Sequence, residues 1–250
     1  MQNKKVFLII SIVLIVVGVF LIMTSQQGKK ISLFKDKSKE IIEKMDKKES
    51  FNLLITGEGT DQLLNSFNYI SDTYDIPFVK LNMDNQNESY KKLLKRLDVN
   101  PSDNIEMIFD IIKEGVSTSG MRGVFSENQL KDMLIKDKQI KEEYKDIDRL
   151  IEDDYEDYYK SDIGYSILYI SQDKEDIAEY RKLLVKNKIK SLVMYPDRLS
   201  MKKAVTFYNE QIDSEDNIEE KLPAVIKTRN GKIEYVKTNV TLDNLIESTK

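Results

Sequence analysis

An order of elements that occurs twice constrains the fold more than any other feature of the sequence. Phe51–Ile55 is an apolar run that ends in the glycine turn Gly57–Gly59, and an amphipathic pattern follows over Asp61–Tyr74. Tyr165–Ser171 is again an apolar run, and the residues from there to Asn187 again place apolar side chains at helical spacing. A strand, a tight turn and a helix are therefore predicted twice, in two repeats of about 110 residues each.

The elements around these two units also correspond. Helical patterns precede them at Ser38–Lys48 and near Ile147–Tyr159. The other elements predicted for the first repeat are strands at Pro77–Met83, Ile105–Ile112 and Val116–Met121 and helices at Glu88–Leu97 and Glu127–Ile135, the last with Ser126 as its N-cap. Those of the second are strands at Ser191–Tyr195 and Pro223–Thr228, a hairpin turn at "RNG" with a returning strand, and helices at Met201–Gln211 and Leu242–Ser248.

Each repeat combines parallel βαβ crossovers with an antiparallel hairpin, which predicts an α/β fold with a mixed central sheet flanked by helices. A length of 250 residues suits two such domains after a terminal segment. We expect residues 1–28 to form a tail and anchor, residues 29–140 the first domain and residues 141–250 the second.

Val6–Met23 reads "VFLIISIVLIVVGVFLIM" and contains no charged residue. Eighteen helical residues span roughly 27 Å, enough for the apolar core of a bilayer. Lys4 and Lys5 precede the segment, and "TSQQGKK" follows it without a signal-peptidase pattern. Residues 6–23 are therefore predicted to be an uncleaved, single-pass transmembrane helix.

The orientation of this helix is argued from charge. Lys29, Lys30, Lys35 and Lys37 follow the segment, so a plain positive-inside count favours a cytoplasmic C-terminus. A short basic tail before a first apolar segment is, however, the usual arrangement of a signal anchor, and a chain without cysteine suits an extracytoplasmic domain. We expect a cell-membrane protein whose C-terminal domains lie outside the cytoplasm.

Composition excludes several kinds of chemistry. The sequence has no Cys and no His, which removes disulfides, thiol redox chemistry, Cys/His zinc sites and Ser-His or Cys-His nucleophiles. The net charge is −4, with both signs interspersed, so no basic field points to nucleic acid. We expect neither a cofactor nor a nucleic-acid partner.

The predicted order of elements resembles the thioredoxin fold, and each repeat covers a full domain of it. The most specific stretch is "KLPAVIKTRNGKIEYV", in which Pro223 opens a strand and Gly231 follows it, at the places of the cis-proline and the turn glycine of thioredoxins. Proline also simply begins strands, and that alternative stays open. In the first repeat Gly115 matches Gly231, and Met107 stands where the proline would be.

Thioredoxins carry C-x-x-C at the first strand-to-helix turn, whereas the two turns here read "GEGTDQL" and "SQDKEDI". The resemblance therefore implies the fold but no oxidoreductase activity. In that fold the turn and the cis-proline loop also hold extended polypeptides by backbone pairing. The resemblance thus implies a polypeptide- or partner-binding surface at Glu58, Gly59, Thr60, Asp61, Met107, Gln172, Asp173, Leu222 and Pro223.

Two further segments have alternative interpretations. Glu142–Lys160 is acidic and rich in tyrosine, which fits a cation or basic-peptide site but fits better an amphipathic helix with a solvated acidic face. Gly115–Gly123 is small and rich in hydroxyls, so it fits an anion-binding nest assisted by Arg122, or a hairpin, which we favour.

Together these features predict a membrane-anchored, redox-inactive binding or scaffold module for a polypeptide or membrane-complex partner in a bacterial cell envelope. Export, bacteriocin handling and conjugation are suitable systems. The alternatives are a carboxylate- or metal-dependent enzyme with a site between the domains, for which Glu58 and Asp61 are a weak candidate pair, and a purely structural subunit.

Overall fold

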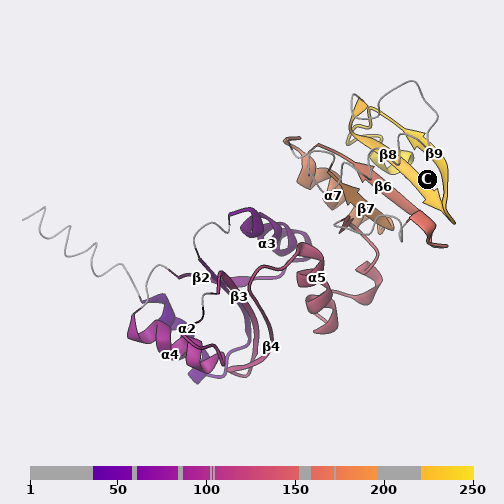
Figure 1. The fold of residues 1–250 in the computed structure, drawn as a ribbon. Helices are drawn as coiled ribbons and strands as arrows, with labels where there is room; N and C mark the ends of the chain where they lie inside the picture. The colour runs from indigo at the N-terminus through magenta and orange to yellow at the C-terminus, as the bar shows by residue number, and fades with distance from the viewer. Residues whose placement is uncertain are drawn as a thin grey trace, which may run out of the picture. The chain divides into compact units, whose positions relative to one another are not determined.

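The computed structural model describes residues 36–57, 61–83, 87–101, 103, 105–151, 159–171, 173–195 and 221–250. None of the helices in these ranges is both long and apolar enough to cross a membrane, and the span predicted at residues 6–23 lies outside them. The described elements group into two compact units, each with one sheet (Figure 1).

The first unit contains a four-stranded mixed sheet with the order β2-β1-β3-β4. Its strands are β1 (Phe51–Thr56), β2 (Phe78–Asn82), β3 (Met107–Lys113) and β4 (Val116–Arg122). β1 is parallel to β2 and antiparallel to β3, and β3 pairs antiparallel with β4. The central strands β1 and β3 are buried over almost their whole length, whereas β4 alternates between exposed and half-buried residues.

Two helices of this unit, α2 (Lys37–Asp46) and α4 (Glu88–Arg96), cover one face of the sheet. Each begins where a polar side chain accepts a hydrogen bond from the first turn, Asp36 for α2 and Asn87 for α4. The apolar side chains that they share with the sheet are Ile41, Met45, Leu53, Ile55, Leu81, Tyr90, Leu93, Leu94, Leu97, Ile108 and Ile112.

The second unit contains the helices α3 (Asp61–Tyr74) and α5 (Glu127–Lys136) together with all later elements. These are the 3₁₀ helix η1 (Glu142–Tyr144), the helices α7 (Ile177–Lys186) and α9 (Leu245–Ser248), and the strands β5 (Arg149–Leu150), β6 (Tyr165–Tyr169), β7 (Ser191–Met194), β8 (Ala224–Arg229) and β9 (Lys232–Lys237). The sheet order is β5-β7-β6-β8-β9, with β5, β7 and β6 parallel and the remaining pairs antiparallel.

Both faces of this second sheet carry apolar side chains, because successive residues of a strand point to opposite sides. Leu168, Val193 and Val225 face α7 and α9, where they meet Tyr180 and Leu245. The opposite face is a second cluster, formed by Ile151, Tyr159, Tyr165, Ile167, Tyr169, Leu192, Met194, Ala224 and Ile226. The sheet is therefore buried on both sides, as strands in an α/β fold usually are.

The two hairpins have the same turn. Both central residues have positive φ, 50° and 78° at Glu114 and Gly115 and 51° and 71° at Asn230 and Gly231. Two successive residues of this kind define the hairpin turn that matches the twist of the strands. The hairpin predicted from "RNG" is thus confirmed. The capping role predicted for Ser126 is also confirmed, since Ser126 and Gln129 form a reciprocal capping box.

One predicted element is wrong in its first part. The helix expected near Ile147–Tyr159 does not begin at Ile147, because Ile147 forms a bridge with Lys190 and Arg149–Leu150 is a short strand on the outer edge of β7. Tyr159, at the end of the predicted range, and Lys160 are helical. The apolar spacing of this segment fits a helix, but the backbone groups of the β7 edge provide partners that the spacing does not reveal. The second sheet consequently has five strands. Residues 152–158 lie outside the described ranges, as does the helix predicted at Met201–Gln211.

In both sheets a parallel βαβ pair is followed by an antiparallel hairpin, and the strand that begins the hairpin lies beside the first strand. This mixed α/β arrangement is the thioredoxin-like order that the sequence implies, and it occurs twice.

Candidate functional site

The turn predicted as a binding surface in the first repeat is described only at its beginning. Glu58, Gly59 and Thr60 lie outside the described ranges, and Asp61 is the first residue of α3, with only its backbone described. Gly57 directly follows β1, and its N–H donates to the Glu106 carbonyl at 2.9 Å. A Cβ at Gly57 would stand 3.1 Å from that oxygen, so glycine suits this close approach.

Met107 lies at the same end of the first sheet, paired with Thr56 of β1. Its side chain is fully buried, and its carbonyl accepts a hydrogen bond from the Gly123 N–H at 2.9 Å. The structure therefore brings Met107 to the edge where β1 ends, but the Met107 side chain points into the interior.

In the second repeat the structure brings the predicted turn and the proline loop to one end of the sheet. Tyr169, the last residue of β6, pairs with Ala224, the first residue of β8. Asp173 is exposed in the turn beyond β6, and its N–H donates to the Ser171 hydroxyl at 3.3 Å. Leu222 lies two residues before the start of β8, the neighbouring strand. Gln172 lies outside the described ranges.

The Leu222–Pro223 peptide bond is cis, as the resemblance implies. The Pro223 ring is buried, and its carbonyl accepts from the Val240 N–H at 2.8 Å. On the other side of Leu222, the Lys221 carbonyl accepts from the Asn239 N–H at 2.9 Å.

Leu222 itself is different from both of its neighbours. In the described part of the chain, neither its N–H nor its C=O makes a hydrogen bond. Its half-buried side chain packs against the cluster that contains Tyr169 and Met194. The residues on both sides of Leu222 are fixed by backbone hydrogen bonds, whereas its own N–H and C=O have no partner in the described ranges. Such a residue can pair with the backbone of an extended chain.

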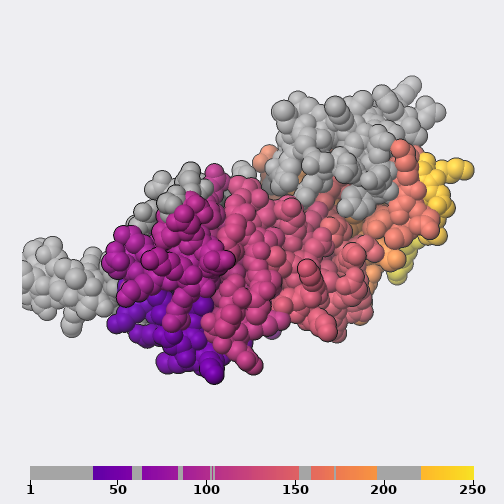
Figure 2. All heavy atoms as spheres, turned by 60° about the horizontal axis from the view of Figure 1, so that its bottom comes forward, coloured from indigo at the N-terminus to yellow at the C-terminus, as the bar shows by residue number. Residues whose placement is uncertain are grey.

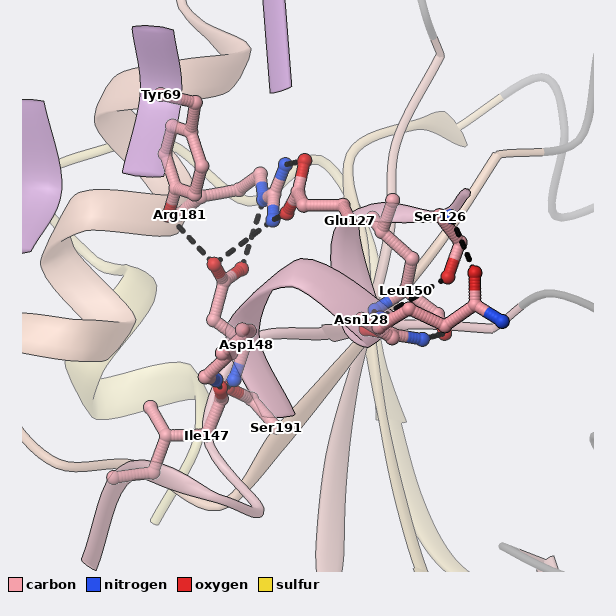
Figure 3. A network of polar contacts seen from close by, with 11 residues as sticks. Tyr69, Ser126, Glu127, Asn128, Ile147, Asp148, Leu150, Arg181 and Ser191 are labelled. Carbon is pink, nitrogen blue, oxygen red and sulfur yellow. Dashed lines mark hydrogen bonds and ion pairs between the residues drawn. The ribbon is translucent and has the colours of Figure 1, made fainter. Parts of the chain in front are cut away.

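A second candidate site in the same unit is a buried charged network, which we call the Arg181 network (Figure 3). Arg181 of α7 is only 5 % exposed. Its guanidinium binds both carboxylate oxygens of Asp148, at 2.8 and 2.9 Å, and also pairs with the Glu127 carboxylate of α5. The Tyr69 ring of α3 lies against the guanidinium, whose carbon is 3.9 Å from the ring centre, and the Tyr69 hydroxyl donates to Asp148 at 2.6 Å.

Further side chains fix the segment around Asp148. Asp148 donates its backbone N–H to the Ser191 hydroxyl of β7 at 2.9 Å. Asn128 of α5 makes two hydrogen bonds with the backbone of Leu150, at 2.7 and 3.1 Å. Lys131 of α5 donates to the Ile147 carbonyl. The segment from Ile147 to Leu150 is therefore bound by side chains of four elements, α3, α5, β7 and α7.

The electrostatics of the network follow from its burial. Burial by itself would lower the pKa of the Arg181 guanidinium, but Asp148 and Glu127 raise it well above its usual value. Burial raises the pKa of the Asp148 carboxyl, against the opposing effect of Arg181. Burial also lowers the pKa of Lys131 to about 8 and raises that of Tyr69. Such pKa shifts are expected for charged groups that are removed from water and bound to one another. The network therefore fits a structural role, in which it holds the helices and the segment around Asp148 together.

The sequence interpretation missed this network. Asp148 falls in the segment expected to be a helix with a solvated acidic face, and the helix predicted before Asn187 rests on its apolar side chains alone, without Arg181. One signal was present: Arg181 is four residues after Ile177 and three before Leu184, so it shares their helix face.

The alternative sites considered from sequence are assigned differently by the structure. The anion nest at Gly115–Gly123 is wrong, because Val116–Arg122 is an extended strand and Arg122 already pairs with Asp110 at 2.7 Å. In Glu142–Lys160, the described Asp148 is bound by Arg181. Within the described ranges, no three acidic side chains gather as a metal site would require.

Comparisons with known proteins add only distant structural likeness. No protein-family model matches the sequence, and no curated protein matches it. Similar solved structures include a designed protein (17 % identity, TM-score 0.31, 40 % of this chain and 86 % of that one). Human ERp44 in its zinc-bound form is 13 % identical, with a TM-score of 0.29, over 82 % of this chain and 55 % of that one. The first two thioredoxin domains of Naumovozyma dairenensis Eps1p are 8 % identical, with a TM-score of 0.29, over 82 % and 93 %. The chain thus spans about half the length of the ERp44 structure.

Proposed function

We propose that the chain is a membrane-anchored, redox-inactive binding module that holds an extended polypeptide beside Leu222. The observation that supports this is that the Leu222 N–H and C=O make no hydrogen bond with any residue that the structure describes, at the end of the sheet beyond which Asp173 is exposed. An extended chain laid along this residue gains two main-chain hydrogen bonds, and neighbouring side chains then set its specificity.

The proposed module carries out no thiol redox step, because the sequence has no cysteine. It carries out no acid-base step either. The buried acids with raised pKa values, Asp148 and Asp110, are bound to Arg181 and Arg122. With the span predicted at residues 6–23, the module belongs in a bacterial cell envelope, outside the cytoplasm, in a system such as export, bacteriocin handling or conjugation.

Photocrosslinking of the full chain in the cells that produce it tests the site. A benzophenone amino acid is placed at Asp173, and a matched control carries it at Asp162. Both positions are exposed aspartates in turns, and they lie at opposite ends of β6. We expect polypeptide adducts from position 173 and not from position 162. Equal labelling at both positions, or labelling at 162 alone, would contradict the proposal.

Amide hydrogen exchange then tests the backbone contact itself. The Leu222 N–H has no acceptor among the described residues, so it should exchange rapidly in the free protein and slowly once the captured polypeptide is added. A synthetic copy of that polypeptide, N-methylated at one residue at a time, keeps its side chains but loses one donor. Methylation at the residue that faces Leu222 should abolish protection. Binding that survives methylation at every position would exclude backbone pairing.

A further inference from the structure

The outer face of α4 in the first unit is strongly basic. The inner face of this helix is buried in the core through Tyr90, Leu93 and Leu94. The exposed residues of the helix are one acid in its first turn and four bases, namely Glu88, Lys91, Lys92, Lys95 and Arg96. Glu88 pairs with Lys91 at 3.0 Å, whereas Lys92 and Lys95 pair with no acidic group that the structure describes. These two lysines are three positions apart and therefore neighbours on the helix surface, where an anion would relieve their repulsion.

The helix α4 lies beside α2, which is the first described helix after the predicted membrane span. Asn87, just before α4, donates to the Asp36 carboxylate just before α2 at 3.1 Å, and Arg96 in the last turn of α4 pairs with Asp46 at the end of α2 at 2.6 Å. The two helices are therefore parallel and begin side by side. Atoms of both reach the surface in Figure 2, α2 in indigo and α4 in magenta.

The distance between these helices and the predicted span is limited by the chain. Residues 24–35 separate the span from Asp36, and even fully extended they reach only about 45 Å. A tether of this length keeps the first unit close to the bilayer, so a contact between the unit and the bilayer surface is an intramolecular event with a high effective concentration.

The charge of the whole chain favours one side of the molecule for that contact. Residues 1–50 contain ten basic and five acidic residues, whereas residues 51–250 contain 29 basic and 38 acidic residues. The helix α4 is a local exception within this acidic part. In α2 the exposed Glu40 and Glu43 offset its lysines, so the basic face belongs to α4. An anionic bilayer surface would attract α4 and repel the acidic remainder of the chain.

We propose that the outer face of α4 binds the anionic lipid headgroups of the bilayer that anchors the chain. This inference rests on the membrane anchor of the proposed function and adds a second, electrostatic attachment to it. Each basic side chain near an anionic leaflet strengthens such an attachment about fivefold, and the effect is weakened by salt. The Leu222 site belongs to the second unit and contributes no residue to this contact.

Acetylation of lysines in the wild-type full chain tests the contact without a substitution. The chain is inserted into nanodiscs of phosphatidylcholine, with or without phosphatidylglycerol, and the reaction of each lysine with an acetylating N-hydroxysuccinimide ester is followed by mass spectrometry. We expect Lys92 and Lys95 to react at least about fivefold more slowly in the anionic discs, and this protection to disappear at high salt. Lys186 and Lys190, exposed lysines of the second unit without an acidic partner in the described ranges, should react equally in both.

The outcomes separate this inference from the anchor. An inserted chain whose Lys92 and Lys95 react equally in the two kinds of disc, or whose four lysines are all protected alike, would overturn the α4 contact alone. A chain that enters neither kind of disc would overturn the anchor and the contact together.

A pair of double variants tests whether the charge of α4 causes the protection. K92Q/K95Q removes two charges and keeps good helix formers, and K186Q/K190Q removes two charges from the second unit as the matched control. Lys91 is the reporter in both variants, and circular dichroism compares their folds. We expect K92Q/K95Q to weaken the attachment about 25-fold and to abolish the protection of Lys91 in anionic discs, and the control to keep that protection. Protection that persists in K92Q/K95Q, or that is lost equally in the control, would overturn the proposal.

Discussion

The Arg181 guanidinium lies over the Tyr69 ring, with 3.9 Å between the guanidinium carbon and the ring centre. The same guanidinium binds Asp148 through two nitrogens, and the Tyr69 hydroxyl binds Asp148 as well. The three side chains close a triangle of contacts that joins α3 and α7, the helices that follow the strand-to-helix turns of the two repeats. The buried Arg181 guanidinium therefore contacts the Tyr69 ring through its face and the Asp148 and Glu127 carboxylates through its N–H groups.

Replacement of Arg181 by methionine should be strongly destabilising. It leaves the Asp148 and Glu127 carboxylates buried without their cation, and loss of one partner from a buried ion pair costs about 3 to 5 kcal/mol. The control is Arg96→Met, which breaks a pair with Asp46 in which the two side chains are 42 % and 57 % exposed. That change should cost about 1 kcal/mol or less. Urea unfolding of the full chain, followed by circular dichroism, compares the two. Equal losses of unfolding free energy in the two variants would show that burial does not determine how much these ion pairs stabilise the protein.

The two contacts of Tyr69 can be separated. Tyr69→Phe keeps the ring on Arg181 and removes the hydroxyl, so it should cost about 1.5 to 3 kcal/mol, the range for a hydrogen bond to a charged group. Tyr69→Leu removes the stacking as well and should cost more, by about 1 kcal/mol. The same unfolding measurement applies. If the phenylalanine and leucine variants are equally stable, the cation–π contact contributes nothing.

Much of the fold could be predicted from sequence because its signals are local. Apolar runs predicted the strands β1, β3 and β6. The "RNG" tripeptide predicted a hairpin turn, which has two positive φ values, and Ser126 predicted the start of a helix. The Arg181 network could not be predicted, because its partners are far apart in sequence. Arg181 and Asp148 are separated by 33 residues, and Tyr69 and Asp148 by 79.

The error at Ile147–Leu150 has the same origin. Apolar residues at positions 147, 150 and 151 satisfy helical spacing, and nothing within the segment reports that the β7 edge needs a partner. At the candidate binding site, the position of Leu222 beside the turn could be anticipated from the thioredoxin-like order of elements. The sequence does not show that the Leu222 backbone groups lack partners in the described ranges while Lys221 and Pro223 on either side are hydrogen-bonded. That contrast is visible only in the structure.

Gly120→Ala should destabilise the first sheet although alanine suits an extended strand. The new methyl group would stand 2.3 Å from the Asp110 carboxylate, so the buried ion pair with Arg122 must shift. Overpacking of this kind costs about 1 to 3 kcal/mol. The control is the same change in an Asp110→Ala background, where the carboxylate is absent and the added cost should fall. Unfolding free energies of the four proteins form a double-mutant cycle. An unchanged cost would show that Asp110 is not the obstacle.

The stability of the second unit should rise at alkaline pH through Lys131. Burial lowers the pKa of this side chain from its usual 10.5 to about 8, with Asp148 and Glu127 opposing the shift and Arg149 and Arg181 adding to it. Below pH 8 the folded and unfolded chains both carry the proton, and the folded state bears the full cost of a buried ammonium. Between pH 8 and 10.5 the unfolded chain keeps the proton that the folded chain loses, so the unfolding free energy increases with pH.

The measurement is the difference in unfolding free energy between the wild type and Lys131→Met, taken at several pH values from 7 to 11. Taking this difference cancels the pH dependence that comes from tyrosines and acidic residues, because both proteins contain them. The wild type should gain on the order of 2 to 4 kcal/mol relative to the variant across that window. Lys136→Met, at the exposed end of the same helix, controls for the loss of a lysine from α5. A difference that stays flat, or that falls as the pH rises, would mean that Lys131 is not desolvated in the folded protein.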